Sequence, residues 1–379
     1  MKKKLNRFYS EIIDSIIENN PSYEESVKKE LIELKESLMK GNNKPPMRNS
    51  TRNEWKLYKK SIENYGDYTW LTFPWFFMEN FIYHEILEIT NFTKNFQDPF
   101  EKQKSKSLEM VLESPKIFDI LNNYLEIEDN ENTSIIEFFK HSLWGNLEDL
   151  SFSCGNNENL KSEDSKTLEK IIVNNSFQLE NFIKNLNQQS TIHIVLDNCG
   201  CELLCDMILA HILIKKKIVS KIQFHTKKYP VFVSDVMIKD FNFTIGQLKK
   251  HQDLKHFGDI FENHLNSKEW TLFEHEFYTS PLPLWEIPFD LRNVFEKASL
   301  VIFKGDANYR RILGDLHWDF NSSFENIVDH FPTSILSLRT LKSGVVVGVD
   351  NSTIEKMNKE DPKWCVNGTR GLIQLSIKK

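Results

Sequence analysis

The turn that follows the apolar run 192–196 carries the residue types that could most plainly do chemistry. Asp197 and Asn198 come directly after this run, and Glu202 lies at the start of the long apolar segment that follows. In open parallel sheets, ligands bind at the carboxyl ends of strands, where the chain turns into a helix. A carboxylate beside a carboxamide supplies oxygen ligands, which hard divalent cations prefer. We therefore expect a metal ion at this turn.

A second apolar run with an acidic end supports this interpretation. Residues 231–235 read as a strand that ends in Asp235. A helix at 201–217 and a strand at 221–225 separate the two runs, so a right-handed parallel crossover would bring both acidic ends to one edge of the sheet. The structural alternative is a helix N-cap, for which Asp and Asn are also preferred. The predicted metal ligands are Asp197, Asn198 and Asp235.

Cationic and amide residues follow the later apolar runs. The run 300–303 leads directly into Lys304, and the run 335–342 carries Arg339 and Lys342. A single Lys or Arg is usually a solvated surface group, but several that follow apolar strands indicate an anion site. A metal ion opposite fixed cations suits phosphoryl transfer, because this reaction spreads negative charge over several oxygens. The segment after the first run holds Gly305, Asp306, Asn308, Arg310 and Arg311.

The cysteines favour neither a disulfide framework nor a zinc site. The chain has five cysteines and no export signal, so reduced thiols are expected. Three of them, Cys199, Cys201 and Cys205, are spaced C-x-C-x₃-C, which lacks the paired arrangement of structural zinc sites. The nearest histidines, His193 and His211, fall inside the expected strand and helix, so a thiol nucleophile has no partner at the turn. We expect these cysteines to pack as small apolar side chains.

The bulk composition excludes several classes of partner. With 379 residues and a net charge of −6 of mixed signs, the chain shows no basic face for nucleic acid. No run approaches the length of a membrane span, and Arg7, Glu11 and Asp14 interrupt what would be the apolar part of a signal peptide. The sequence therefore predicts a cytoplasmic protein that binds neither nucleic acid nor membrane. No pattern indicates an oligomeric state.

The first half of the chain has helical periodicity, and the second half alternates between strands and helices. The sequence therefore predicts an α/β fold, with a mainly helical region over 1–187 and a Rossmann-like domain with a mostly parallel sheet over 188–379. On the aromatic helix 68–90, Glu79 would ordinarily face solvent, because unpaired Glu is seldom buried. Further helices are expected at 6–19, 22–40, 176–187, 245–265 and 289–298, and further strands at 270–277, 300–303, 335–342 and 371–377.

Six segments in the same order along the chain resemble motifs of the damage-control phosphatases, a family formerly described as a domain of unknown function. The last motif, R-T-x-K, is typical of the subfamily that includes the acidic residue methyltransferase. The segments are Pro74-Trp75-Phe76-Phe77-x-Glu79, Leu143-Trp144-Gly145-Asn146-x-x-Asp149-Leu150-Ser151, Asp197-Asn198-x-Gly200-x-Glu202-Leu203, Phe232-Val233-Ser234-Asp235, Lys304-Gly305-Asp306-x-Asn308-Tyr309-Arg310 and Arg339-Thr340-x-Lys342.

The resemblance implies a fold, an activity and a set of site residues. The fold would be a helical N-terminal region packed on a Rossmann-like α/β domain. The activity would be that of a phosphatase for small sugar phosphates, such as fructose 1-phosphate and fructose 6-phosphate, with magnesium, manganese, cobalt or nickel bound. Carried over residue by residue, the metal ligands are Asp197, Asn198 and Asp235, which with Asp306 form the catalytic set. The substrate-binding residues are Glu79, Asn146, Glu202, Lys304, Asp306, Ala307, Asn308, Tyr309, Arg310 and Lys342.

Some positions depart from the family pattern, and none of them removes a predicted ligand. Cys199 and Cys201 replace a small residue and an aromatic one, Val231 replaces a Trp, and His84 replaces an Arg. The change at His84 bears on substrate preference if its side chain reaches the pocket. The resemblance also favours a pocket position for Glu79, in place of the exposed one.

We expect hydrolysis by an activated water. A bound metal ion would lower the pKa of a water, and the resulting hydroxide would attack phosphorus in line while Arg310 and Lys342 neutralise the phosphate oxygens. Asp306 or Glu202 would carry a proton. An aspartyl-phosphate route through Asp197 is the alternative, but the chain lacks the D-x-D pattern that such a route uses.

Two other functions compete with the phosphatase. The subfamily name implies methyl transfer from S-adenosylmethionine to protein carboxylates, and this cofactor is expected only in that case. Methyltransferases of the usual Rossmann kind carry a Gly-rich loop after the first strand, where this chain offers only Gly200. A non-catalytic sugar-phosphate sensor would bind ligand without turnover, and the intact acidic set argues against it.

Overall fold

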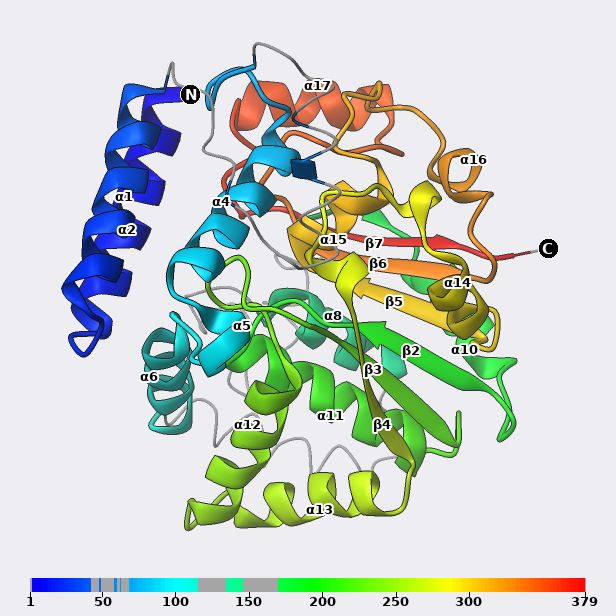
Figure 1. Cartoon of the computed structure of the whole chain (residues 1–379). Helices are drawn as coiled ribbons and strands as arrows, with labels where there is room; N and C mark the ends of the chain where they lie inside the picture. Colours follow the sequence, from blue (N-terminus) through cyan, green and yellow to red (C-terminus); the bar gives the residue numbers. More distant parts are fainter. Residues whose placement is uncertain are drawn as a thin grey trace. The chain divides into compact units, whose positions relative to one another are not determined.

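A seven-stranded sheet with the order β1-β7-β6-β5-β2-β3-β4 organises most of the chain in this computed structural model (Figure 1). All neighbouring strands are parallel except β6 and β7, so the predicted α/β class with a mostly parallel sheet is confirmed. The strands are β1 Ile171–Asn174, β2 Thr191–Val195, β3 Lys221–Lys227, β4 Trp270–His275, β5 Leu300–Lys304, β6 Ile335–Thr340 and β7 Gly371–Ser376.

The chain forms two compact units that cut across the predicted division at residue 187. Unit 1 comprises Met1–Lys106, Lys228–Asp235 and Thr279–Pro281, and unit 2 comprises Ser107–Lys227, Val236–Tyr278 and Leu282–Lys379. The predicted domain boundary stays a prediction.

Asn146 and Asp149 lie outside the described residues. The structure describes residues 2–41, 48, 58, 59, 62, 68–114, 134–145 and 170–378.

Helices cover both faces of the sheet in unit 2 (Figure 1). Along β5, Leu300 and Ile302 belong to one hydrophobic core, and Val301 and Phe303 belong to the other. Burial on both faces is typical of central parallel strands. The first core includes α8 Ile135–Trp144, α10 Ser176–Lys184, α11 Cys201–Lys215, α12 Ile238–Lys250 and α13 Lys255–Asn266, and the second includes α14 Phe289–Phe295, α15 Gly305–Ile312, α16 Phe324–Val328 and α17 Asn351–Glu360.

The strand order reverses between β2 and β5. From β2 the chain adds β3 and then β4 on one side, and it returns to the other side of β2 to add β5 and β6. At such a reversal the connections leave the sheet in opposite directions, which opens a crevice at the carboxyl ends of the two strands. The segments after β2, β5 and β6 are therefore neighbours, as the sequence predicts.

Helix α11, which follows β2, is the buried centre of unit 2. Every residue from Cys201 to Leu213 is buried, including Glu202 and Asp206. A helix that is apolar on all sides packs inside a protein. The few charged groups on it therefore need partners within the protein, because an unpaired buried charge is costly.

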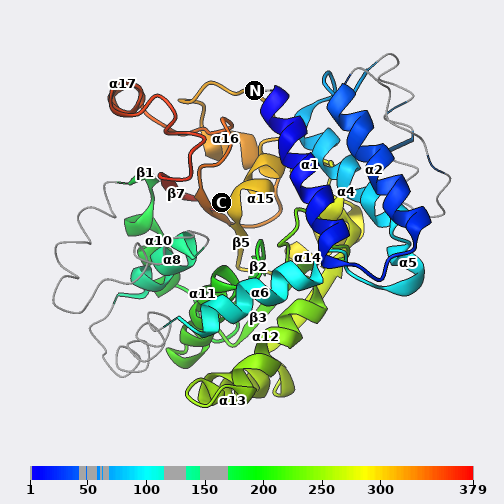
Figure 2. The same ribbon diagram turned by 90° about the vertical axis from the view of Figure 1, so that its left-hand side faces the viewer.

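Unit 1 contains the helices predicted for the N-terminal part. Helices α1 Lys2–Asn19 and α2 Glu25–Lys40 lie side by side (Figure 2). The predicted helix 68–90 begins only at Trp75 because Pro74, at φ −52 and ψ 133, is extended. The other helices of this part are α4 Trp75–Ile89, α5 Phe92–Asn95 and α6 Glu101–Leu112, which runs into unit 2.

The predicted strand at 231–235 is wrong. Phe232 and Val233 have φ of 50° and 64° and form a turn, closed by the Ser234 N–H, which donates to the Phe232 carbonyl at 2.7 Å. Val231 is buried in the core of unit 1, and Phe232 and Val233 are partly buried and pack against that core. A short apolar run can thus belong to a turn that packs on the core. The hydrophobic pattern alone does not distinguish such a turn from a short strand.

The predicted helix 245–265 is two helices, α12 and α13. His251 ends α12 with an extended backbone at ψ 129. Gly258 allows the second helix to pack against the end of the first, since a Cβ at this position would lie 2.7 Å from the backbone nitrogen of Lys249. Strand β1 and helices α8 and α15 were not predicted from the sequence.

Replacing Leu209 by Ala should lower the free energy of unfolding by about 2–5 kcal/mol, since Leu209 is fully buried in the centre of α11. Urea denaturation followed by circular dichroism measures the change. The matched control is Lys215→Ala at the exposed end of the same helix, which should stay within about 0.5 kcal/mol of the wild type. Equal stability of the two variants would contradict the central position of α11.

Candidate functional site

The turn between β2 and α11 places Asn198 between two carboxylates. The Asn198 amide nitrogen donates to Asp197 Oδ2 at 2.8 Å and to Glu202 Oε2 at 2.9 Å. The N-cap alternative for this segment is wrong, because α11 is capped by Gly200 without a side-chain hydrogen bond. Asp197 is 5% exposed, so its carboxylate is largely desolvated. The predicted acidic cluster at this strand end is therefore present.

The first residue of α15 packs directly against Asp197. Gly305 has φ +79°, and a Cβ at this position would overlap the Asp197 carboxylate. Both the backbone conformation and the close approach require glycine. The segments after β2 and β5 thus meet at the point where the strand order reverses.

Lys304, the last residue of β5, is buried beneath this turn. Its ammonium lies 3.5 Å from Glu202 Oε1 and 3.1 Å from Asp206 Oδ1, and it donates to the Ser142 hydroxyl at 2.8 Å and to the Ser142 carbonyl. The side chain is fully buried. The ammonium therefore links α8, α11 and β5, and its predicted contact with substrate stays a prediction.

One ammonium serves two buried carboxyl groups in this cluster. Burial raises the pKa of Asp206 to about 7, although Lys304 favours its ionised form, and the Glu202 carboxylate raises it further. Burial opposes the charge of Lys304 as well, but Asp206 and Glu202 together raise the pKa of its ammonium. Lys304 thus stays charged, and Asp206 holds a proton up to near neutral pH.

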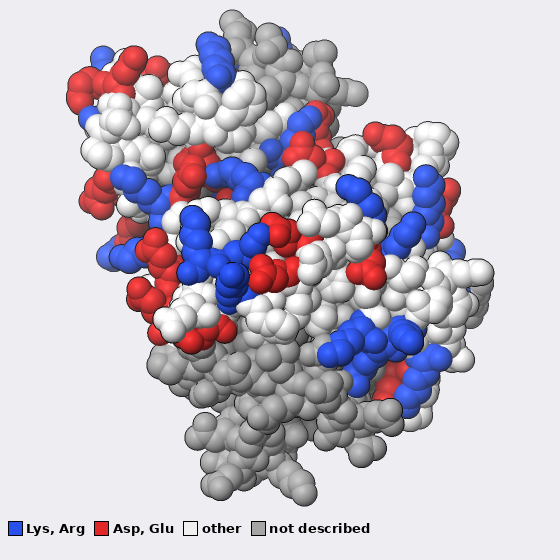
Figure 3. All heavy atoms as spheres, turned by 90° about the horizontal axis from the view of Figure 1, so that it is seen from below, with Lys and Arg blue, Asp and Glu red and all other residues white. Residues whose placement is uncertain are grey.

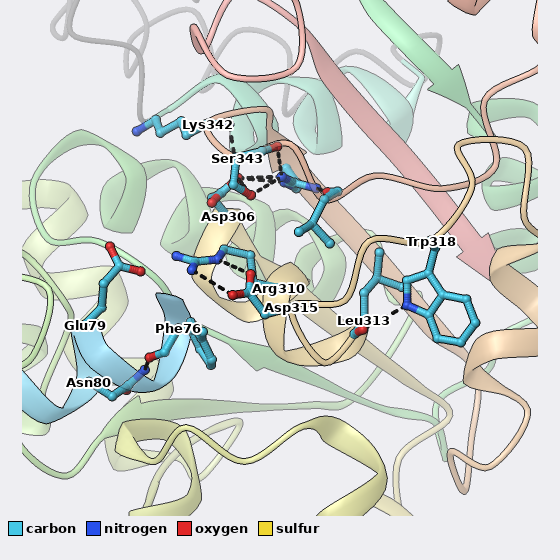
Figure 4. Close-up of polar contacts among 12 residues, drawn as sticks. Phe76, Glu79, Asn80, Asp306, Arg310, Leu313, Asp315, Trp318, Lys342 and Ser343 are labelled. Atoms are coloured by element: carbon cyan, nitrogen blue, oxygen red, sulfur yellow. Dashed lines mark hydrogen bonds and ion pairs between the residues drawn. The ribbon is translucent and has the colours of Figure 1, made fainter. Parts of the chain in front are cut away.

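Asp306 anchors the segment that follows β6 (Figure 4). Its Oδ1 accepts from the Arg339 Nε at 2.9 Å, the Lys342 N–H at 3.0 Å and the Ser343 hydroxyl at 3.2 Å. Burial opposes ionisation here, but Arg339 and then Arg310 lower the pKa of Asp306. The carboxylate is therefore held in its ionised form, and its predicted catalytic role stays a prediction.

The two predicted phosphate-binding cations are held in different ways. Arg310 is 6% exposed, and Asp315 accepts from its Nε at 2.7 Å and from its Nη2 at 3.2 Å. Lys342 is exposed, and its ammonium points away from Asp306 (Figure 4). The sequence analysis did not predict Asp315 as the partner of Arg310, although Gly314 directly before it indicates a turn.

The other predicted residues of α15 differ in exposure. The Asn308 amide donates to the Leu196 carbonyl at 3.2 Å and to the Lys304 carbonyl at 2.8 Å, which joins α15 to the end of β2. The Tyr309 side chain lies in the core and donates to Gln374 at 2.7 Å, and Ala307 is partly exposed. Arg311 points away from this cluster, since it donates to the carbonyls of Tyr278 and Leu282.

Glu79 and Asp235 belong to unit 1. Glu79 is 8% exposed and accepts from the Tyr9 hydroxyl at 2.9 Å, so it does not face solvent as the helical pattern alone would suggest. Burial is the main cause that raises the pKa of Tyr83 well above its usual range, and the negative charges of Glu79 and Asp235 raise it further. Because Asp197 belongs to unit 2, the predicted three-ligand set draws on both units and stays a prediction. The pocket role of Glu79 stays a prediction as well.

The sulfur and imidazole groups do not form a metal centre among the residues that the structure describes. Cys201, Cys205 and Cys365 are free thiols. No group of three or more His, Cys, Asp or Glu side chains suited to a metal ion occurs in the described ranges. Any metal ion at the turn after β2 would thus use the amide of Asn198 together with carboxylates.

The charged surface is mixed where it can be seen. On the face in Figure 3, Lys and Arg side chains lie beside Asp and Glu side chains. Within the described part of the chain, no helix combines the length and apolar character needed to cross a bilayer.

Comparisons with known proteins identify relatives over most of the chain. The family model of the damage-control phosphatase ARMT1-like domain matches residues 1–357. Damage-control phosphatase ARMT1 of Bos taurus is 33% identical over 350 residues, which cover 85% of this chain and 79% of the relative. The Homo sapiens protein of that name is 32% identical over 350 residues, with the same coverage.

A solved structure shares the fold. The crystal structure of a DUF89 family protein from Pyrococcus horikoshii superposes with a TM-score of 0.51 and 17% identity, and the match covers 100% of this chain and 97% of that one. At this identity the likeness concerns the fold alone.

Asp206→Asn should change the pH dependence of stability. Burial raises the pKa of Asp206 from 3.8 to about 7 in the folded chain. Between these values the unfolded chain releases the proton and the folded chain keeps it, so this group makes the free energy of unfolding fall as the pH rises. The variant lacks that contribution, and urea unfolding across the interval measures the difference.

The matched control is Asp253→Asn, at an exposed position of the same unit. It should keep the pH dependence of the wild type. If Asp206→Asn shows that same dependence, Asp206 does not hold a proton in the folded chain.

Proposed function

The chain belongs to the family of ARMT1-like damage-control phosphatases, and on this basis we propose that it hydrolyses small sugar phosphates of the fructose 1-phosphate or fructose 6-phosphate type with the aid of a divalent metal ion. The observation that carries the proposal is the meeting of two strand ends. The acidic turn with Asp197 and Asn198 follows β2, and the cationic helix α15 with Arg310 follows β5.

The residues at this turn fit a hard divalent ion. Asp197 offers carboxylate oxygens, and the Asn198 nitrogen faces Asp197 and Glu202, which directs the amide oxygen to the opposite side. Gly305 keeps the space beside the Asp197 carboxylate clear of a side chain. We propose Asp197 and Asn198 as ligands, with Asp235 as the third ligand predicted from the sequence. Oxygen ligands suit Mg²⁺, Mn²⁺, Co²⁺ or Ni²⁺.

The chain's own cations would bind the phosphate. The Arg310 guanidinium is held in place by Asp315, so it is ordered before substrate arrives. Lys342 carries an exposed ammonium, and Asp306 holds its backbone in place. When bound, a divalent ion would supply a Lewis acid that polarises phosphate oxygens and acidifies a water. Together these charges would neutralise the oxygens of the phosphoryl group during transfer.

The arrangement favours attack by water over an aspartyl-phosphate route. Asp197 Oδ2 accepts from the Asn198 amide and is a proposed metal ligand, so we propose water and not Asp197 as the nucleophile. Of the two predicted proton carriers, we favour Glu202. Asp306 is bonded to Arg339 and has a lowered pKa, so it would be a weak proton acceptor.

The methyltransferase alternative gains no support from the turn after β2. A Cβ at Gly200 would lie 2.9 Å from the Ser107 hydroxyl, so this glycine accommodates helix α6. The chain offers no further glycine in that turn. We therefore keep phosphate hydrolysis as the proposed reaction and test methyl transfer in a parallel assay.

We expect phosphate release from at least one fructose phosphate when Mn²⁺, Ni²⁺, Co²⁺ or Mg²⁺ is added to metal-free protein. The double variant Asp197→Asn, Asp235→Asn should lose metal-dependent turnover and keep its circular dichroism spectrum, because the substitutions remove ligand charge with little change of volume. A parallel assay with labelled S-adenosylmethionine tests methyl transfer. Undiminished phosphate release by the folded double variant would end the proposal.

Lys342→Met should lower kcat/KM for phosphate release by about tenfold or more, because it removes a positive charge that would neutralise the phosphate oxygens in the transition state. Lys363→Met, a second exposed lysine of unit 2, is the control and should leave kcat/KM unchanged. Equal effects of the two substitutions would show that Lys342 acts only through overall charge.

A further inference from the structure

Asp206 is a buried carboxyl group that the proposed chemistry leaves without a role. It is 1% exposed, and its Oδ1 accepts from the Ser142 hydroxyl at 2.6 Å and lies 3.1 Å from the Lys304 ammonium. Its Oδ2 has no hydrogen-bond partner among the described residues. A buried carboxyl group that is only partly satisfied is costly, so its presence calls for a function.

A continuous line of polar contacts runs from Asp206 to the proposed metal ligands, all within unit 2. The Lys304 ammonium lies between Asp206 and Glu202, at 3.1 Å and 3.5 Å. The other oxygen of Glu202 accepts from the Asn198 amide at 2.9 Å, and the same amide donates to Asp197 at 2.8 Å. Each group in this line orients the next.

Lys304 is held more closely by Asp206 and Ser142 than by Glu202. Its distance to the Ser142 hydroxyl is 2.8 Å, whereas the 3.5 Å to Glu202 Oε1 is at the limit of a hydrogen bond. An ammonium freed from Asp206 would move onto Glu202, the other carboxyl group within reach. Glu202 would then turn from Asn198 toward the new partner.

We propose that Asp206 is a positioning residue that, together with Ser142, holds the Lys304 ammonium back from Glu202 and so leaves Glu202 to fix the Asn198 amide. The proposal rests on the proposed function, in which the Asn198 oxygen is a metal ligand. Outer-shell partners of this kind set the orientation of a ligand and so its affinity for the ion.

Close packing of α8 on α11 is what brings Ser142 to Asp206. A Cβ at Gly145 would lie 3.0 Å from the Glu202 Cα, so only glycine allows this approach without a shift. Ser142 lies in the last turn of α8, directly before the segment Leu143-Trp144-Gly145. The proposed function gives this segment no role, and the positioning of Ser142 supplies one.

Three variants separate positioning from stability. Asp206→Ala removes the acceptor, and it should weaken Mn²⁺ binding to the full chain by about tenfold or more in isothermal titration calorimetry. Asp206→Asn keeps an acceptor for Ser142 and Lys304 and should restore most of the affinity. Leu209→Ala, on the same helix and outside the network, destabilises the fold and should leave Mn²⁺ affinity at the wild-type value.

The crystal structure of Asp206→Ala is the second measurement. We expect the Lys304 ammonium within hydrogen-bond distance of Glu202 and the Glu202–Asn198 hydrogen bond broken. An unchanged Lys304–Glu202 distance, unchanged Mn²⁺ affinity in Asp206→Ala or an equal loss in Leu209→Ala would overturn the inference. A wild-type protein that neither binds Mn²⁺ nor releases phosphate would overturn the proposed function alone, since the crystal structure still decides whether Asp206 restrains Lys304.

Discussion

A single buried ammonium that links three elements is the interaction on which the candidate site depends. Lys304 ends β5, Glu202 and Asp206 lie on α11, and Ser142 lies on α8. Removing these charges from water costs several kcal/mol each, and attraction within the cluster offsets this only when the geometry is good. The end of β5 and the start of α11 are therefore fixed relative to each other by charge, and the turn with Asn198 lies directly above this pair.

The order of the strands makes that interaction possible. Because β5 pairs with β2 on the side opposite β3, Lys304 comes to lie beside the turn that follows β2. Burial of β5 on both faces leaves its last residue with partners inside the protein only. The next residue, Gly305, then brings the backbone of α15 against Asp197. One reversal of strand order thus produces both the acidic cluster and the cationic segment beside it.

The ends of the strands beside the candidate site could largely be predicted from the sequence, and side-chain directions could not. Apolar runs followed by polar residues placed the ends of β2 and β5 to within one residue, whereas β6 ends at Thr340, two residues before the predicted end. The run before Asp235 was wrongly predicted to be a strand, because the same residue types pack against the core of unit 1 in a turn. Lys304 reads as one of several cations, and only the three-dimensional structure shows that its side chain turns inward. Asp206 has no motif of its own, although its place one helical turn after Glu202 was a usable signal.

The two proposed phosphate-binding cations differ in what they contribute before substrate arrives. Arg310 is clamped by Asp315, which has φ 54° and whose N–H donates to the Arg310 carbonyl at 2.7 Å, so side chain and backbone hold each other. A non-glycine residue in this conformation carries strain, which the paired contacts must offset. Lys342 instead has its backbone held by Asp306 and its side chain in solvent, so it must lose rotamer freedom when it meets a phosphate. The site therefore combines a preorganised charge, suited to transition-state stabilisation, with an adaptable one that accommodates sugar phosphates of different shape.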